Sequence, residues 1–273
     1  MKLFILSLFF VQITNTSLAF PVQRTLQKIR SLEREGKIPV AVLDLDETLI
    51  HSDKRKVASY IEALKKYNTT TLGTWPGQSR MAYEKLSYAG EAPMRSLQNQ
   101  YDSVALFNQM GIEDLNFIHV LDSLMLPIYL SGEFIFLDSV NRGAVGLLAA
   151  IYKAHGKIYF VTSRFEAAQG VATLESLRKL NLYDNAGQSV LVMRQEGESS
   201  LEFKIRSFQE IRSSVVGREE VFMVSENEPE NLNAMIDVFP GAMPVFVTGA
   251  IMHTDVPLNP MVPIVYTEDF TEK

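Results

Sequence analysis

The sequence predicts an α/β protein in which a three-layer, Rossmann-like core carries an inserted helical cap. Three observations lead to this prediction. From about residue 138 to residue 249, helical and strand patterns alternate, which is typical of a parallel sheet with helices on both faces. The strand patterns are short apolar runs, as buried parallel strands require. Residues 51–132 interrupt the alternation with helices and turn formers, so we expect an insertion there.

The first nineteen residues resemble a secretory signal peptide. Lys2 supplies the positive charge, "LFILSLFFV" the apolar segment, and "SLA" before Phe20 a small-residue cleavage site. The alternative is a membrane anchor, but the apolar run breaks after about eleven residues, whereas a helix needs roughly 20 to span a bilayer. We therefore predict an exported protein, periplasmic or secreted, without a stable membrane anchor.

Composition excludes several classes of function. The formal net charge is −6, and no segment concentrates Lys and Arg, which argues against a nucleic-acid polymer as partner while leaving small nucleotides open. The chain has no cysteine, so disulfides, thiolate catalysis, cysteine-bound metals and a lipidated cysteine anchor are excluded. The oligomeric state is not fixed by the sequence.

The first element after the signal is a helix over "RTLQKIRSLEREG". Leu26, Ile29 and Leu32 share one face of it, and Gly36 is suited to its C-terminal cap. A buried strand follows in "IPVAVLDLDETLI", residues 38–50, and it ends in Asp44 and Asp46.

These two aspartates are unusual at the end of an apolar strand. Residues i and i+2 of an extended chain point to the same side, so the two carboxylates share a face. Such a pair repels, and one member is driven toward its neutral form. The pair therefore indicates a metal ion, a role in proton transfer, or both.

The cap and the second part of the core follow in order. Within 51–132 we expect helices at 53–67 and 96–110 around the turn-rich loop "NTTTLGTWPGQ", and we expect the cap aromatic Trp75 to pack among helices. The core then comprises 20–50 and 133–273. Its later helices are predicted at 138–155, 165–180, 201–212 and from 229, and its strands at 157–162, 189–193, 220–225 and 244–249.

Polar residues recur where these elements end or begin. Asp44 and Asp46 follow the first strand, Thr162 and Ser163 follow "KIYFV", and Glu226 follows "VFMV". Ligands of parallel α/β sheets gather at the carboxyl ends of the strands, so this edge is the predicted site.

Four motifs in this order resemble those of the haloacid dehalogenase superfamily. "DLDET" is similar to its first motif, Asp-x-Asp-x-Thr, "FVTSR" to its second, and "VSENEPEN" to its acidic fourth motif, while "FKIR" supplies the lysine of the third. The resemblance covers about 38–50 and 133–249, and in these motifs it is closest to secreted acid phosphatases of the superfamily.

The resemblance implies a role for each motif residue. Asp44 would be the nucleophile that accepts a phosphoryl group, and Asp46 would act as general acid and base while its main-chain carbonyl binds Mg²⁺. Thr162 and Lys204 would stabilise the phosphoryl oxygens. Substrate-binding roles would go to Thr48, Ser163 and Arg164. The metal set would be Asp44, Asp46 and Glu226, supported by Asn227 and Glu230.

The fourth motif departs from the family pattern because Glu226 and Glu230 stand where aspartates are usual. Glutamate can still bind Mg²⁺ through oxygen, but its longer side chain leaves metal preference open. Each candidate also has a structural interpretation. Thr162 or Ser163 could cap a helix, Lys204 could be solvated, and the two glutamates could favour a helix dipole.

The predicted function is an exported, Mg²⁺-dependent phosphatase that acts on a small phosphomonoester through an aspartyl phosphate. A non-catalytic binding protein with the same fold, or a phosphotransferase that passes the phosphoryl group to another acceptor, remain alternatives. The pair Asp44 and Asp46 favours catalysis, because a halide leaving group would not need the second aspartate.

Overall fold

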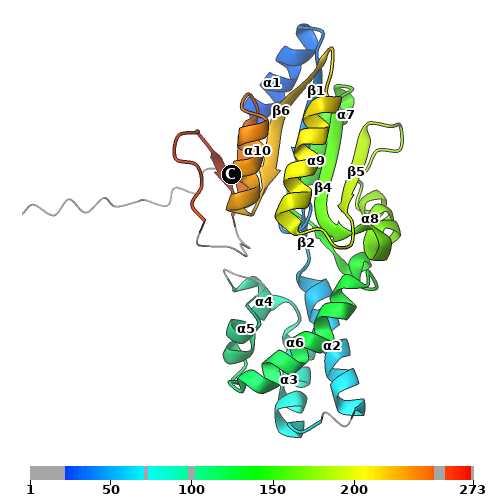
Figure 1. Cartoon of the computed structure of the whole chain (residues 1–273), viewed down its shortest axis with the longest axis vertical. Helices are drawn as coiled ribbons and strands as arrows, with labels where there is room; N and C mark the ends of the chain where they lie inside the picture. Colours follow the sequence, from blue (N-terminus) through cyan, green and yellow to red (C-terminus); the bar gives the residue numbers. More distant parts are fainter. Residues whose placement is uncertain (1–21, 71–72, 98–101, 249–255, 272–273) are drawn as a thin grey trace, which may run out of the picture.

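The computed structural model describes residues 22–70, 73–97, 102–248 and 256–271, and it has two lobes (Figure 1). The larger lobe is built on a parallel sheet with the strand order β5-β4-β1-β6-β7-β8. Its strands are β1 (Ile38–Leu43), β4 (Lys157–Phe165), β5 (Ser189–Arg194), β6 (Glu219–Glu226), β7 (Met243–Val247) and β8 (Val265–Thr267). The predicted α/β class is confirmed. The predicted signal peptide, residues 1–19, lies outside the described residues.

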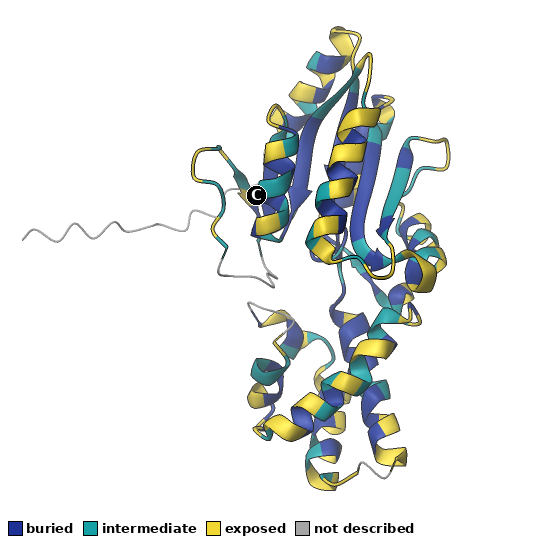
Figure 2. Cartoon of the chain, viewed as in Figure 1, coloured by how far each residue is buried: buried dark blue, intermediate teal, exposed yellow. Residues whose placement is uncertain are grey.

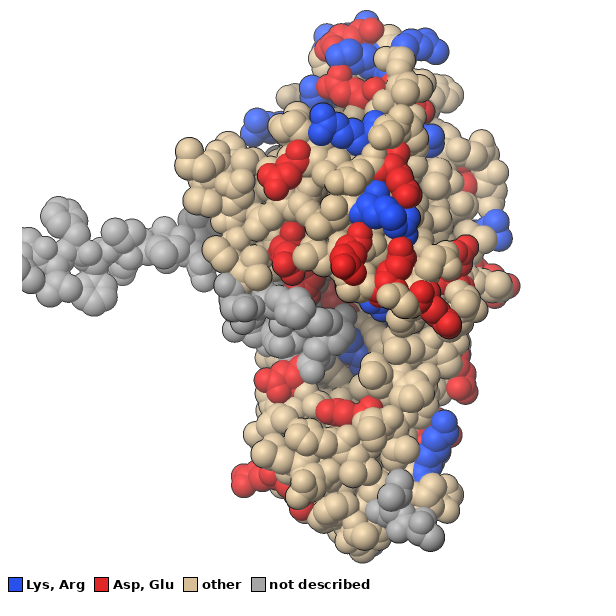
Figure 3. All heavy atoms as spheres, in the orientation of Figure 1, with Lys and Arg blue, Asp and Glu red and all other residues tan. Residues whose placement is uncertain are grey.

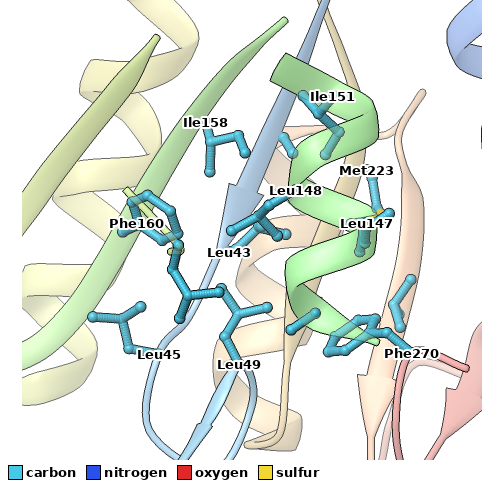
Figure 4. Close-up of a cluster of buried hydrophobic side chains, with 14 of the residues drawn as sticks. Leu43, Leu45, Leu49, Leu147, Leu148, Ile151, Ile158, Phe160, Met223 and Phe270 are labelled. Atoms are coloured by element: carbon cyan, nitrogen blue, oxygen red, sulfur yellow. The ribbon is translucent and has the colours of Figure 1, made fainter. Parts of the chain in front are cut away.

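Side chains of β1 alternate between the two faces of the sheet, and each face is covered by helices. Ala41 and Leu43 point to the face covered by α1 (Val22–Arg34), α7 (Ala144–Lys153) and α8 (Glu166–Lys179). Val40 and Val42 point to the face covered by α9 (Ser200–Ser214) and α10 (Pro229–Val238). The central strands are buried, the edge strands β5 and β8 are only partly buried, and the outer helix faces are exposed (Figure 2). Figure 4 shows the first of these cores around Leu43. Burial on both faces explains why β1 reads as a continuous apolar run.

The join between α7 and β4 requires glycine. His155 has a φ of 54°, and Gly156 lies so close to the preceding helix and to β1 that an added Cβ would meet the Pro39 oxygen at 2.8 Å. Only a residue without Cβ fits this approach. The tight join starts β4 in register beside β1, with Lys157 opposite Val40.

The smaller lobe is helical and has its own hydrophobic core. It contains α2 (Asp53–Thr69), α3 (Pro76–Ala89), α4 (Ala92–Arg95), α5 (Ser103–Gln109) and α6 (Leu115–Leu130). Phe117 of α6 is the centre of this core and meets the rings of Tyr67, Trp75 and Phe107 at centroid distances of 5.5, 6.2 and 6.4 Å. Trp75 therefore packs among helices, as expected. None of the helices in the described ranges is long and apolar enough to cross a membrane.

Two predicted helices are wrong in extent. The helix expected at 138–155 begins only at Ala144, because Ser139–Val140 forms strand β3 and pairs with β2 (Ile50–His51). The helix expected at 96–110 is shorter, since α5 begins at Ser103, where the Asp102 carboxylate accepts a hydrogen bond from the Ala105 amide. Helices α3 and α6 and strand β8 were not predicted.

Candidate active site

The carboxyl ends of the two central strands bring three predicted residues into direct contact. Asp44 follows β1, Glu226 ends β6, and Lys204 of α9 reaches between them. The Lys204 ammonium donates to Asp44 Oδ1 at 2.5 Å, to Glu226 Oε2 at 2.8 Å and to the Val161 carbonyl at 2.9 Å. Lys204 is buried, and among the residues that the structure describes it forms ion pairs with these two carboxylates. The interpretation of Lys204 as a solvated lysine is therefore wrong.

Asp44 has one oxygen held and one oxygen open. Oδ1 accepts from Lys204, whereas Oδ2 has no hydrogen-bond partner among the residues that the structure describes, and Asp44 lines the cleft. Burial and the negative charge of Glu226 raise the pKa of Asp44, and Lys204 acts against both. A cation beside the open oxygen, or Lys204 alone, must hold this carboxyl ionised before it can act as a nucleophile.

Glu226 is fixed by its own backbone neighbours as well as by Lys204. Its Oε1 accepts hydrogen bonds from the amides of Asn227 at 3.1 Å and Glu228 at 3.2 Å. Asn227 in turn accepts a 3.1 Å hydrogen bond from the Thr48 hydroxyl. Thr48 is buried and is not among the residues that line the cleft, so it links β1 to the fourth motif instead of facing a substrate.

Asp46 is held by two arginines, one from each lobe. Arg164, at the end of β4, donates to both carboxylate oxygens at 2.8 Å, and Arg55 of α2 donates to Oδ1 from the other side. Burial alone would raise the pKa of Asp46, but the two guanidinium groups outweigh it and hold that pKa far below its usual range. In this arrangement Asp46 is a carboxylate, the form of a base, and it becomes an acid only if a guanidinium withdraws.

A second carboxylate completes the network. Asp138 is fully buried at its side chain and lies 2.7 Å from Arg164 and 3.3 Å from Arg55. The Arg55 guanidinium also donates to the Tyr129 hydroxyl at 2.9 Å, and its carbon lies 4.5 Å from that ring. Two arginines therefore face two carboxylates where the helical lobe joins the core.

Thr162 and Ser163 follow the same edge of the sheet. Thr162 is buried, and its hydroxyl accepts a 3.3 Å hydrogen bond from the Arg164 amide. The Ser163 hydroxyl lies 2.5 Å from that of Ser200 at the start of α9. Helix α8 begins at Glu166 without a side-chain cap, so neither residue serves as its N-cap.

These residues line a cleft of about 480 Å³ between the two lobes. Figure 3 shows the hollow, with basic atoms inside it and acidic side chains on the nearby core surface. The helical lobe contributes a largely apolar wall from α6 together with Arg55 and Lys56 of α2, and the core contributes the remaining charged residues. Among the predicted residues, the following line the cleft: Asp44, Asp46, Thr162, Ser163, Arg164, Lys204, Glu226, Asn227 and Glu230.

The donor set fits a magnesium ion. In the ranges that the structure describes, no three acidic, histidine or cysteine side chains converge as a preformed metal cluster. Mg²⁺, however, keeps several waters and needs only one or two protein carboxylates. Asp44, with its open oxygen, and Glu226 supply two, and the Asp46 main-chain carbonyl is the third predicted ligand. Burial and the repulsion from Glu226 raise the pKa of Asp44, and a bound cation would relieve the repulsion.

Sequence reasoning missed Arg55, Asp138 and Tyr129. Arg55 lies in "HSDKRK", directly after the first motif, and its position beside that motif was a usable signal. Asp138 and Tyr129 carry no local signal, because they reach the site only through the packing of the helical lobe on the core.

No family model and no curated protein matches the chain. Several solved structures match it. Protein Tyrosine Kinase A from Mycobacterium tuberculosis matches with a TM-score of 0.50 and 15% identity over 85% of this chain and 94% of that chain. A haloacid dehalogenase-like family hydrolase from Streptococcus pneumoniae gives 0.45 and 10% over 78% and 87%. Another hydrolase from Streptococcus pneumoniae gives 0.42 and 16% over 74% and 89%.

The likeness to Protein Tyrosine Kinase A, at a TM-score of 0.50, shows a shared fold. At these identities the likeness establishes the fold and leaves the activity to the site.

Proposed function

We propose that the protein is an exported, Mg²⁺-dependent phosphatase that hydrolyses a small phosphomonoester through an aspartyl phosphate on Asp44. The observation that carries this proposal is the open Oδ2 of Asp44 at the cleft, on a carboxylate that Lys204 holds in place at 2.5 Å. A fixed carboxylate with one free oxygen is the arrangement that a nucleophile needs.

Two steps follow from the side chains. In the first, Asp44 Oδ2 attacks phosphorus and the bond from phosphorus to the leaving oxygen breaks. Asp46 gives that oxygen its proton when a guanidinium has withdrawn and Asp46 is protonated, and otherwise the oxygen leaves as an anion. In the second, Asp46 takes a proton from water, the water oxygen attacks phosphorus, and inorganic phosphate leaves Asp44. Lys204 and the Thr162 hydroxyl stabilise charge on the phosphoryl oxygens. Bound Mg²⁺ would neutralise the repulsion between Asp44 and the incoming phosphate.

The two arginines on Asp46 favour the second step. A carboxylate with a strongly lowered pKa is ready to act as a base but is a poor acid. Substrates with good leaving groups, which need no proton, should therefore be hydrolysed more readily than alkyl esters.

The decisive experiment is hydrolysis of an activated aryl phosphate by protein lacking residues 1–19. Activity should require Mg²⁺, disappear with EDTA, and be absent in Asp44→Asn. Wild-type protein that cannot be distinguished from Asp44→Asn over a broad panel of phosphomonoesters would favour the binding-protein alternative. A phosphorylated product formed from an added alcohol would favour phosphotransfer.

Export has its own test. The charged, apolar and small-residue order of residues 1–19 supports cleavage before Phe20. The intact mass of protein from the natural host should begin at Phe20, and a mature form that keeps Met1 to Ala19 would contradict export by this route.

A further inference from the structure

Five basic side chains line the cleft, and Arg194 differs from the other four. Lys204, Arg164 and Arg55 contact buried carboxylates, and Lys56 lies 3.2 Å from Glu47. Arg194 has no ion pair or hydrogen bond within the described part of the chain. Its Nε is buried without a partner, and its guanidinium carbon lies 4.1 Å from the centre of the Phe165 ring. The cleft therefore contains a guanidinium that the protein itself leaves unmatched.

The position of Arg194 places this charge beside the catalytic edge. It ends β5, opposite Phe165 in the register with β4. The first residues of α9, Ser200 and Leu201, line the cleft with it. The first-turn amides of a helix have no partner within the helix, and the dipole there favours an anion. The Ser199 hydroxyl already accepts from the Glu202 amide and donates to the Glu202 carboxylate. The unmatched guanidinium of Arg194 is therefore the main feature that attracts negative charge here, and the dipole of α9 adds to it.

The acidic groups nearby are already compensated. Glu198, whose negative charge attracts Arg194, accepts a 2.7 Å hydrogen bond from Arg206. Arg206 also lies 3.0 Å from Glu210. The Glu166 carboxylate accepts from the Gln195 amide. Burial lowers the pKa of Arg194, which remains cationic at neutral pH, so a bound anion would recover part of the lost solvation.

The opposite wall of the cleft is apolar. Met125, Leu126, Tyr129 and Leu130 of α6 line it, and Leu126 is 52% exposed although its side chain is hydrophobic. An exposed apolar surface inside a cleft of about 480 Å³ suits a flat or branched hydrocarbon body of a small molecule.

We propose that Arg194, with the N-terminus of α9, binds a carboxylate carried by the organic part of the substrate, whose apolar body lies against α6. The substrate class is a phosphomonoester of a hydroxy acid with an apolar or aromatic body. This inference rests on the proposed phosphatase function. Arg binds both carboxylates and phosphates bidentately, and a carboxylate is favoured over a second phosphate because one unmatched guanidinium supplies one positive charge.

The test compares esters that differ only in this charge. Wild-type protein and Arg194→Met are assayed with 3- and 4-carboxyphenyl phosphate and with their carbamoyl counterparts, which match the size without the charge. At least one carboxylate ester should show a KM about tenfold lower than its carbamoyl partner in the wild type, a difference of about 1.4 kcal/mol, because a hydrogen bond to a charged group is stronger than one to a neutral group. Arg194→Met should remove that preference, so that each carboxylate ester and its carbamoyl partner have similar KM values.

Controls separate the possible failures. Arg206→Met removes an exposed arginine of α9 outside the cleft and should keep the preference, and Arg194→Gln repeats the test if the methionine variant does not fold. The ratio of the two KM values is compared between the wild type and each variant, so differences in the intrinsic reactivity of the esters cancel. No preference in the wild type, or a preference that survives in both Arg194 variants, would overturn the carboxylate site while the phosphatase function stands. No hydrolysis above that of Asp44→Asn would overturn the phosphatase function and this inference with it.

Discussion

Replacing Arg55 by methionine should destabilise the fold through uncompensated buried charge. Arg55 is 1% exposed at its side chain, and it faces Asp46 and the fully buried Asp138. Without it, Arg164 remains as the one guanidinium in contact with both carboxylates in the described structure. Methionine fills much of the same volume, so the change removes charge and leaves the packing nearly complete.

The magnitude follows from burial. Removing one partner of a buried ion pair costs about 3–5 kcal/mol, because the other partner stays buried without compensation. For a chain of this size that corresponds to a fall in Tm of roughly 10 °C. The matched control is Arg206→Met, whose side chain is 44% exposed and pairs with Glu198 and Glu210. Exposed pairs of this kind contribute about 0–1 kcal/mol.

The assay is urea unfolding of the wild type, Arg55→Met, Arg206→Met, Asp138→Asn and the double variant Arg55→Met/Asp138→Asn. Neutralising Asp138 removes the excess charge that Arg55→Met creates, so the double variant should be more stable than Arg55→Met alone, with a coupling of about 1–3 kcal/mol. If Arg55→Met loses no more stability than Arg206→Met, the network does not hold the lobes as described.

Three further predictions concern the metal, acid stability and one tight turn. Glu226→Gln should need much more Mg²⁺ for the same rate, whereas Glu230→Gln should titrate nearly like the wild type. Both glutamates line the cleft, but of the two it is Glu226 that shares Lys204 with Asp44. Rates titrated against metal rank the two. Burial alone would raise the pKa of Glu47, but Lys56, His51 and Ser52 hold that pKa at about 2 instead of 4.5. The ionised carboxylate therefore stabilises the fold above pH 4.5, and this stabilisation is lost as the pH falls to 2. The stability gap between wild type and Glu47→Gln should shrink by about 3 kcal/mol across that window in urea unfolding, and a constant gap would contradict the ion pair. Gly143→Ala should destabilise the fold by more than about 1 kcal/mol, because its φ is 78° and an added Cβ would meet the Phe270 oxygen at 2.3 Å. Gly146→Ala should stabilise the fold by about 0.5–1 kcal/mol, because Gly146 lies within α7 with open space around the added Cβ. Thermal unfolding of both should give opposite signs.

The core could be predicted from sequence because its strands are buried on both faces. Apolar runs such as "IPVAVL", "KIYFV" and "VFMV" are typical of buried parallel strands. Asp44 after the first run and Glu226 after the last are conspicuous because carboxylates rarely end apolar runs. The contacts of Lys204 were predictable only through the order of the motifs, since a lone lysine on a helix carries no such signal.

The connection between the lobes could not be predicted, because it depends on pairing between distant segments. Asp138 reads as the first residue of a helix, yet the two residues after it pair with Ile50 and His51 across the whole insertion. Helix α6 was missed because its sequence is apolar on most sides and contains Pro127, which disfavours a helix interior. Arg55 and Arg164 contact Asp46 from the two lobes because the helical lobe packs on the core. Their charges lower the pKa of Asp46, which makes it a better base and a poorer acid.

The central claim is that Asp44 carries the phosphoryl group, and trapping that group tests it most directly. Asp46→Asn lacks the base that activates water, so an activated aryl phosphate, which needs no acid, should load Asp44 faster than the intermediate is hydrolysed. After an acid quench, peptide mass spectrometry should find one phosphoryl group on the peptide that contains Asp44 and none in the Asp44→Asn/Asp46→Asn variant. Release of inorganic phosphate by the wild type, with no phosphorylated Asp44 in Asp46→Asn at any quench time, would contradict the account.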